Sequence, residues 1–274
     1  IRRRPRSTPL YSSAASDVYK RQNQKGLPAY VSVPGTRLYT GGSYLGSSHN
    51  PFAVPDPVRD DYKVNNLTLS GELTAKRLHD RRTLHRDFDN ARRLLDNHGV
   101  TDAIDQFNLQ AFDMVTNDRA RNAFDISQED PALRDRYGRT TMGQSMLLAR
   151  RLVEAGVTFV TVSQGSWDFH DAYVINSQRK SPPYDKALAA LISDVHSRGL
   201  DKDVLIVAMG EFGRTPRINK LAGRDHWGAV MSVALSGGGL RMGQVVGASN
   251  RKGEEPIEAP YRPENVLAMV CLLY

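Results

Sequence analysis

The sequence predicts an α/β domain built around a mainly parallel sheet. Two apolar runs rich in β-branched residues, 157–162 and 204–209, have the composition of strands that are buried on both faces. An amphipathic helix is expected before each run, at 142–155 and at 184–198, and each expected helix ends at a glycine. This alternation is typical of parallel sheets, in which ligands bind beyond the carboxyl ends of the strands.

The part of the chain before this alternation is expected to be partly extended and partly helical. Residues 27–33 alternate in polarity and end at a Pro-Gly pair, which indicates a short strand and a turn. A loop rich in glycine and serine follows at 36–54. Apolar positions at helical spacing then predict a helical insertion over 73–137, whose last part, 123–137, is a looser helical connection.

After the second apolar run, short strands and glycine-rich turns are expected. Residues 230–235 and 244–248 have strand composition, and the SGGG sequence at 236–239 predicts a tight turn. Pro263 is suited to the first position of a helix that continues through 264–269.

Composition is that of an ordinary globular domain, with 274 residues of which 40% are hydrophobic and 24% charged. No apolar run approaches the roughly 20 residues that a membrane-spanning helix needs. Six basic residues and one acidic residue lie in 1–22, a net charge of +5, which leaves only +2 of the total +7 for the other residues. We therefore expect no nucleic-acid partner and no membrane span.

The two ends of the chain differ in character from the rest. The segment PLYSSAASDVYKRQ is similar to translated sequencing-adapter sequence, and the final CLLY is similar to the adapter read from the other end. We expect 1–22 and 271–274 to be adapter-like, with a disordered basic arm as the alternative for 1–22, and 23–270 to be a single, partial domain. The only cysteine, Cys271, lies in the last segment, so a disulfide within the chain is excluded.

Three loops that follow strand-like segments carry side chains able to bind a metal ion. Their sequences are SQGSWDFHD, GEFGRTP and AGRDHW. Mixed carboxylate and imidazole ligands suit Zn²⁺, Mn²⁺ or iron. Loops at one edge of one sheet would bring such side chains to a common point. In chain order, the loops offer Asp168, His170, Asp171, Glu211, Asp225 and His226.

Two arginines, Arg214 and Arg224, stand beside these candidate ligands. The planar guanidinium group binds phosphate, sulfate or carboxylate through two parallel hydrogen bonds. A metal site with arginine at strand ends is suited to hydrolysing an ester of an oxyanion, because the metal activates the nucleophile and stabilises the leaving group. The alternative for each arginine is an ion pair with Glu211 or Asp225 that only holds the loops together.

Six segments carry a recognisable pattern: WDFH, YDKALAALISDVHSRGL, VLIVAMGEFGRTPRIN, AGRDHW, SVALSGGGL and GQVVGAS. Together they resemble bacterial domain-of-unknown-function family 1501, in the alkaline phosphatase/sulfatase-like superfamily. The resemblance is dense from residue 141 to 270 and looser back to 27. It implies a three-layer α/β/α sandwich, truncated at the N-terminus here, with a metal site at the carboxyl edge of a mainly parallel sheet. It also implies cleavage of phosphate or sulfate esters of small molecules or glycans.

The resemblance implies roles for individual residues. Asp168, His170 and His226 would bind one metal ion, and Glu211 would be the carboxylate ligand of a second. Asp225 belongs to the same candidate metal set, with Arg214 and Arg224 as contacts to the substrate anion. Zinc is the expected ion, with manganese, calcium or magnesium as alternatives.

Two departures from the superfamily pattern bear on function: the first is the basis of a non-catalytic alternative, and the second implies that the site is incomplete. Superfamily enzymes usually have Asp-His after the central strand, whereas here Glu211 is followed by Phe212, which cannot bind metal. The N-terminal strand whose loop would supply the nucleophile is not found before Leu27. The first expectation is a metal-dependent hydrolase of phosphate or sulfate esters. The alternative is a non-catalytic binding or scaffold protein that keeps the fold. Relatives with a twin-arginine export signal imply a periplasmic or exported location.

Overall fold

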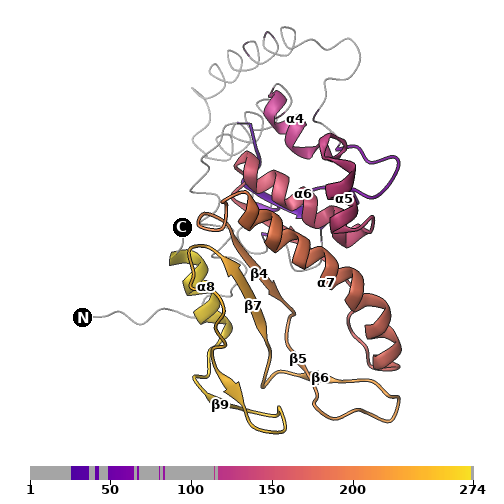
Figure 1. The fold of residues 1–274 in the computed structure, drawn as a ribbon, viewed down its shortest axis with the longest axis vertical. Coiled ribbons are helices and arrows are strands. Elements are labelled where there is room, and N and C mark those ends of the chain that lie inside the picture. Colours follow the sequence, from indigo (N-terminus) through magenta and orange to yellow (C-terminus); the bar gives the residue numbers. More distant parts are fainter. Residues whose placement is uncertain are drawn as a thin grey trace, which may run out of the picture.

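The computed structural model describes residues 26–36, 41–42, 49–64, 67, 80, 83, 114 and 117–272. The predicted segment 1–22 lies outside the described residues, and so does most of the predicted insertion before residue 117. Within the described residues, helices and strands are mixed, which confirms the α/β class (Figure 1).

Three short strands form a parallel sheet in the order β2-β1-β3. Strands β1 (Tyr30–Val33) and β3 (Phe159–Val162) pair over their full lengths, with Tyr30 opposite Phe159. Both lie where the sequence predicts strands. Strand β2 (Phe52–Ala53) pairs with β1 inside the stretch 36–54, which the sequence predicts to be loop. A two-residue strand has no periodicity to detect, so its presence is decided by the neighbour that accepts it.

The helices between residues 118 and 155 gather in the upper part of the molecule (Figure 1). The predicted connection 123–137 contains the end of one helix, a short 3₁₀ helix and a second helix. The next helix is capped as predicted, because Gly156 adopts a left-handed conformation with φ 105° and closes it. In chain order the elements are α4 (Asp118–Phe124), η3 (Ile126–Gln128), α5 (Pro131–Tyr137) and α6 (Thr141–Ala155).

Helix α7 (Tyr173–Ser197) begins eleven residues earlier than the predicted start at 184. Pro182 and Pro183 lie inside it. Proline lacks an amide hydrogen and is disfavoured within helices, so the sequence favours a helix that begins after the pair. The extra turns matter for the site, because they carry the start of α7 down to the loops that follow β4 (Figure 1).

The main hydrophobic core lies between α4, α6, α7 and the parallel sheet. Leu147, Leu148 and Leu152 of α6 are fully buried in it, together with Val31 and Val33 of β1. Burying side chains of this size stabilises a fold by about 1.5–3 kcal/mol each. The parallel sheet and the helices that pack on it are therefore held together by the core. The loop after β3 begins at this well-packed part of the fold.

A cluster of ionised side chains is buried beside this core. The guanidinium of Arg150, whose side chain is 1% exposed, lies 2.8 Å from Glu129, 2.6 Å from Glu154 and 2.9 Å from Asp194. Arg151 also pairs with Glu129, and Arg198 pairs with Asp194 and Glu154. Three cations therefore face three carboxylates, which balances the charge that the core encloses.

The lower part of the molecule contains antiparallel pairs, contrary to the prediction of one mainly parallel sheet. Strand β4 (Leu205–Met209) pairs antiparallel with β7 (Val233–Gly237), and its first four residues are only half-buried. The prediction that 204–209 is buried on both faces of a parallel sheet is therefore wrong. An apolar, β-branched run indicates a strand, but it does not determine the direction of the neighbouring strand. Parallel pairing among the described residues is confined to β1, β2 and β3.

The remaining short elements are two further antiparallel pairs and a C-terminal helix. The strand expected at 244–248 is reduced to its last residue, whereas the helix that begins at Pro263 is confirmed. None of the described helices combines the length and apolar character needed to cross a bilayer. The elements are β5 (Gly213–Arg214) with β6 (His226–Trp227), β8 (Ala248–Ser249) with β9 (Pro256–Glu258), and α8 (Pro263–Leu272).

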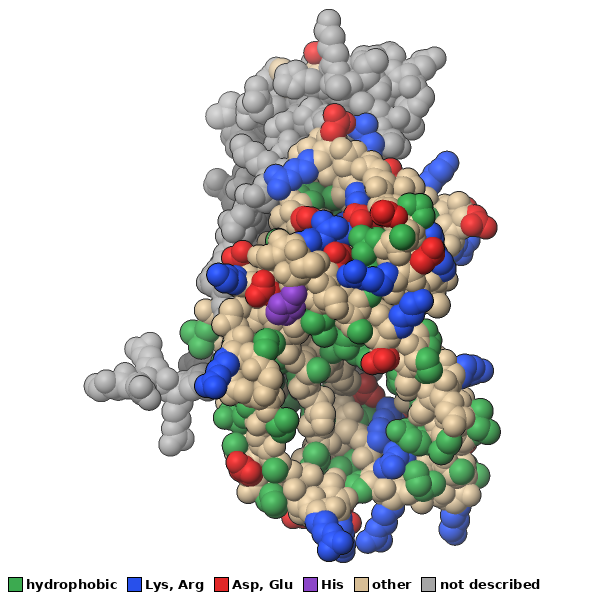
Figure 2. All heavy atoms as spheres, viewed as in Figure 1, with side chains coloured by type: hydrophobic (Ala, Val, Ile, Leu, Met, Phe, Trp, Pro, Cys, Tyr) green, Lys and Arg blue, Asp and Glu red, His purple; other side chains and the backbone are tan. Residues whose placement is uncertain are grey.

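Charged side chains of both signs cover much of the helical part of the face shown in Figure 2. Exposed apolar side chains are frequent in the C-terminal part, where they include Val245, Val246, Ile257 and Leu272. On the face shown, the described residues therefore present charged side chains of both signs together with apolar side chains.

Candidate metal centre

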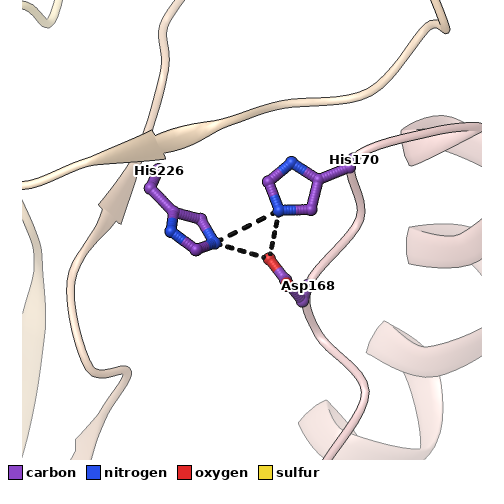
Figure 3. A group of neighbouring side chains, drawn as sticks. All are labelled: Asp168, His170 and His226. Atoms are coloured by element: carbon purple, nitrogen blue, oxygen red, sulfur yellow. Dashed lines mark hydrogen bonds and ion pairs between the residues drawn. The ribbon is translucent and has the colours of Figure 1, made fainter.

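Three of the predicted ligands meet at one point in the structure (Figure 3). Asp168 and His170 come from the loop that follows β3, and His226 comes from β6. The Oδ1 atom of Asp168 lies 3.0 Å from Nε2 of His170 and 3.0 Å from Nε2 of His226. The two histidine nitrogens are 3.2 Å apart. Of the residues that the structure describes, these three form the one group with metal-ligand spacing.

The spacing of these atoms suits a zinc ion. Zinc–nitrogen and zinc–oxygen distances of about 2.0–2.1 Å, at a tetrahedral angle, place neighbouring ligand atoms about 3.3 Å apart. The three observed separations of 3.0, 3.0 and 3.2 Å are close to that value. The side chains of Asp168, His170 and His226 are 54%, 44% and 53% exposed, so water can reach the group. Three protein ligands and an accessible fourth position are the arrangement of catalytic zinc sites.

Asp225 lies behind His170 and outside this group of three. Its Oδ1 atom is 2.9 Å from Nδ1 of His170. A metal ion on Nε2 of His170 would require the ring proton to be on Nδ1, and the carboxylate of Asp225, which only accepts hydrogen bonds when ionised, is placed to accept it there. A histidine whose outer nitrogen donates to a carboxylate is the usual form of a metal-ligating histidine.

Arg214 and Glu211 border the group on another side. The guanidinium of Arg214 donates to Asp168 through Nη1 and to Oε1 of Glu211 through Nη2, the latter at 2.9 Å. The hydrogen bond from Arg214, followed by that from His226, lowers the pKa of Asp168. Hydrogen bonds from His170 and Asn219 likewise lower the pKa of Asp225. Both carboxyl groups are thus held in the ionised form that metal binding requires.

The guanidinium of Arg224, predicted as a contact to the substrate anion, is engaged with backbone carbonyls and an aromatic ring. Its Nη1 atom donates to the backbone carbonyls of Thr215 at 2.6 Å and Pro216 at 2.9 Å, and its guanidinium lies over the ring of Tyr173. The predicted alternative for this arginine was an ion pair that holds the loops. In the structure it joins the loops through carbonyl oxygens rather than through Glu211 or Asp225.

Phe212 packs against the group. Its ring centroid lies 4.4 Å from that of His226, and the guanidinium of Arg214 lies 5.4 Å from the Phe212 ring. The residue that follows Glu211 therefore supplies an apolar wall beside His226.

The three loops converge because they hydrogen-bond to one another. The backbone of Tyr173 donates to the carbonyl of Ala222 at 2.8 Å, and that of Arg224 donates to the carbonyl of Phe169 at 2.9 Å. Gly223 lies so close to the first loop that an added Cβ would be 1.9 Å from the carbonyl carbon of His170. A side chain at position 223 would separate the loops. Convergence therefore depends on loop-to-loop pairing and not on a shared edge of one parallel sheet.

One residue of the site is missed by sequence reasoning. Asn219 donates from Nδ2 to the carbonyl of His170 at 2.9 Å and to Oδ1 of Asp225 at 3.0 Å. The sequence shows only an asparagine between two candidate loops. Asparagine is common in turns of any function, so its position does not indicate a role in the site.

The chain matches one family model, described as a protein of unknown function (DUF1501), over residues 3–274. The match includes both end segments predicted to be adapter-like, so their foreign origin stays a prediction. No curated protein and no solved structure matches the chain. Since the family model covers nearly all of its 274 residues, the chain belongs to the DUF1501 family.

Proposed function

We propose that this protein is a metal-dependent hydrolase of phosphate or sulfate esters. The observation that supports the proposal is the spacing of one carboxylate oxygen and two imidazole nitrogens, from Asp168, His170 and His226, at 3.0–3.2 Å. Two nitrogens and one oxygen suit zinc, or manganese, better than calcium or magnesium, which prefer oxygen ligands. A bound zinc ion would lower the pKa of a water molecule and offset negative charge on the ester oxygens.

The side chains around the group have separate tasks in this proposal. Arg214 offers five N–H donors, and its contacts with Asp168 and Glu211 use two of them, so the guanidinium can also bind an anionic ester oxygen. Glu211 holds Arg214 in place rather than binding a second ion. The substrate is an anionic ester of a small molecule or a glycan, since the group is open to solvent.

Metal analysis and turnover of aryl phosphate and aryl sulfate test this proposal. We expect about one zinc ion per chain, and turnover that disappears when a chelator removes the metal. His226→Ala should lose both metal and turnover. The matched control is His196→Ala, because His196 is also partly exposed and lies near an aspartate, Asp201 at 3.7 Å, but belongs to α7. Absence of metal from the purified protein, or turnover that survives His226→Ala, would refute the proposal.

The second candidate is a non-catalytic binding or scaffold protein. The packing of Phe212 against His226 favours it, because an apolar ring takes the place of a ligand for a second ion. In that case the protein binds zinc and hydrolyses neither ester, and Phe212→His does not create turnover. Under either function a periplasmic or exported location remains part of the proposal, and fractionation of the native host tests it.

A further inference from the structure

We propose that Asn219 and Asp225 are positioning residues that fix the ring orientation and the tautomer of His170. The inference rests on the proposed metal site, where His170 must present Nε2. It changes the role of Asp225, which the sequence predicts to be a metal ligand. Neither residue contacts the proposed ion, so both act through His170.

Asn219 uses both ends of its amide. Its Nδ2 atom donates to the carbonyl of His170 at 2.9 Å and to Oδ1 of Asp225 at 3.0 Å. Its Oδ1 atom accepts from the backbone N–H groups of Leu221 and Gly223, both at 2.9 Å. The amide therefore ties the backbone of His170 to the carboxylate that its ring contacts.

Asp225 is held at several points. Its Oδ1 atom accepts from Nδ1 of His170 at 2.9 Å as well as from Asn219. Its backbone N–H donates to Oγ1 of Thr215 at 3.0 Å, and its carbonyl accepts from the Thr215 N–H at 2.9 Å. Asp225 lies outside the group of three with metal-ligand spacing, and its Oδ1 atom is shared by two donors, so it is placed to orient His170 rather than to bind the ion itself.

The physical consequence concerns both geometry and basicity. A carboxylate on the outer nitrogen fixes which ring nitrogen is protonated and makes the other a stronger ligand. Loss of such a partner lowers metal affinity by about 10–100-fold in zinc sites. Removal of an asparagine side chain that only shapes a loop, in contrast, leaves metal affinity unchanged.

The chain contains a matched control for Asn219. Asn250 also accepts through Oδ1 from the backbone N–H groups two and four residues later, Lys252 at 3.1 Å and Glu254 at 2.9 Å. It lies in the turn between β8 and β9. Asn219→Ala and Asn250→Ala thus remove the same local hydrogen bonds, and only the first also removes the donors to His170 and Asp225.

The first measurement is zinc affinity of the full chain by competition with a chelating dye. We expect Asn219→Ala to weaken zinc binding by about 10-fold or more, and Asn250→Ala to bind like the unaltered protein. Asp225→Asn is a second variant of nearly unchanged shape, and it should also weaken binding because the neutral amide is a poorer partner for His170. Equal affinity of Asn219→Ala and Asn250→Ala would overturn the inference.

The second measurement does not require metal. Long-range ¹H–¹⁵N spectra of the metal-free protein report the tautomer of His170 at a pH well above about 6.5. In the metal-free chain Asp225 faces Nδ1 of His170 at 2.9 Å and Asp168 faces Nε2 at 3.0 Å, so the two carboxylates compete for the ring proton. We expect a larger share of the Nδ1–H tautomer in the unaltered chain and in Asn250→Ala than in Asp225→Asn and Asn219→Ala. An unchanged tautomer in both variants overturns the inference. A chain that binds no zinc would instead refute the proposed function, while the tautomers still decide the roles of Asn219 and Asp225.

Discussion

Replacement of Arg150 by methionine should destabilise the protein strongly. The side chain is 1% exposed and contacts Glu129, Glu154 and Asp194 at 2.6–2.9 Å. Methionine keeps much of the length of arginine but removes its charge, so the change leaves two cations for three carboxylates in the cluster. Two of those carboxylates, Glu129 and Asp194, have side chains that are at most 10% exposed.

The magnitude follows from the partners that remain. Removing one partner of a buried ion pair costs about 3–5 kcal/mol, because the other charge stays buried without compensation. Arg151 still pairs with Glu129, and Arg198 still pairs with Asp194, which reduces the imbalance. We therefore expect a loss in the free energy of unfolding near the lower end, about 3 kcal/mol.

Urea denaturation followed by circular dichroism measures this loss, with Arg139→Met as the control. Arg139 pairs with Asp135 at 2.5 Å, but the two side chains are 44% and 65% exposed. Exposed pairs contribute about 0–1 kcal/mol. If Arg150→Met destabilises the protein no more than Arg139→Met does, the three carboxylates do not depend on Arg150 and the reasoning is refuted.

Two further predictions concern the pH dependence of stability and the close approach of the site loops. Burial alone would raise the pKa of Asp194, but hydrogen bonds from Arg198 and Tyr137 and the charge of Arg150 outweigh it and lower that pKa. The contribution of Asp194 to stability is therefore complete above its unfolded pKa of about 4 and is lost as the pH falls below that value. Urea midpoints should drop in that pH range. Urea midpoints that do not change with pH there would contradict this. Gly223→Ala should weaken zinc binding about 10-fold or more, since its Cβ would collide with His170. Gly228→Ala, with nothing within 4 Å, should not, and equal zinc affinities for the two variants would show that the close approach is not required.

Local signals were sufficient for several elements. Helix α6 and its closing Gly156 follow from apolar spacing and a glycine in a left-handed conformation, which are properties of a few neighbouring residues. The same is true of β1 and β3. The start of α7 was misplaced because Pro182 and Pro183 are locally unfavourable within a helix, yet the helix extends through them.

The chemistry of the candidate ligands was likewise readable from the sequence. Asp168 and His170 are two positions apart in one loop, and Asp225 and His226 are adjacent in another. These residue types predict metal ligands wherever the loops meet. Nothing in their spacing along the chain distinguishes a ligand from a residue that supports one.

The sequence by itself therefore determined the α/β class, the position of the main helices and the kinds of side chain that could bind a metal ion. Only the tertiary structure decided that β4 pairs antiparallel with β7, that Asp225 contacts the outer nitrogen of His170, and that Arg224 holds backbone carbonyls. The physical reason is distance along the chain. His170 and Asp225 are 55 residues apart, and their contact exists because two loops pair through backbone hydrogen bonds around Gly223, which no local pattern encodes.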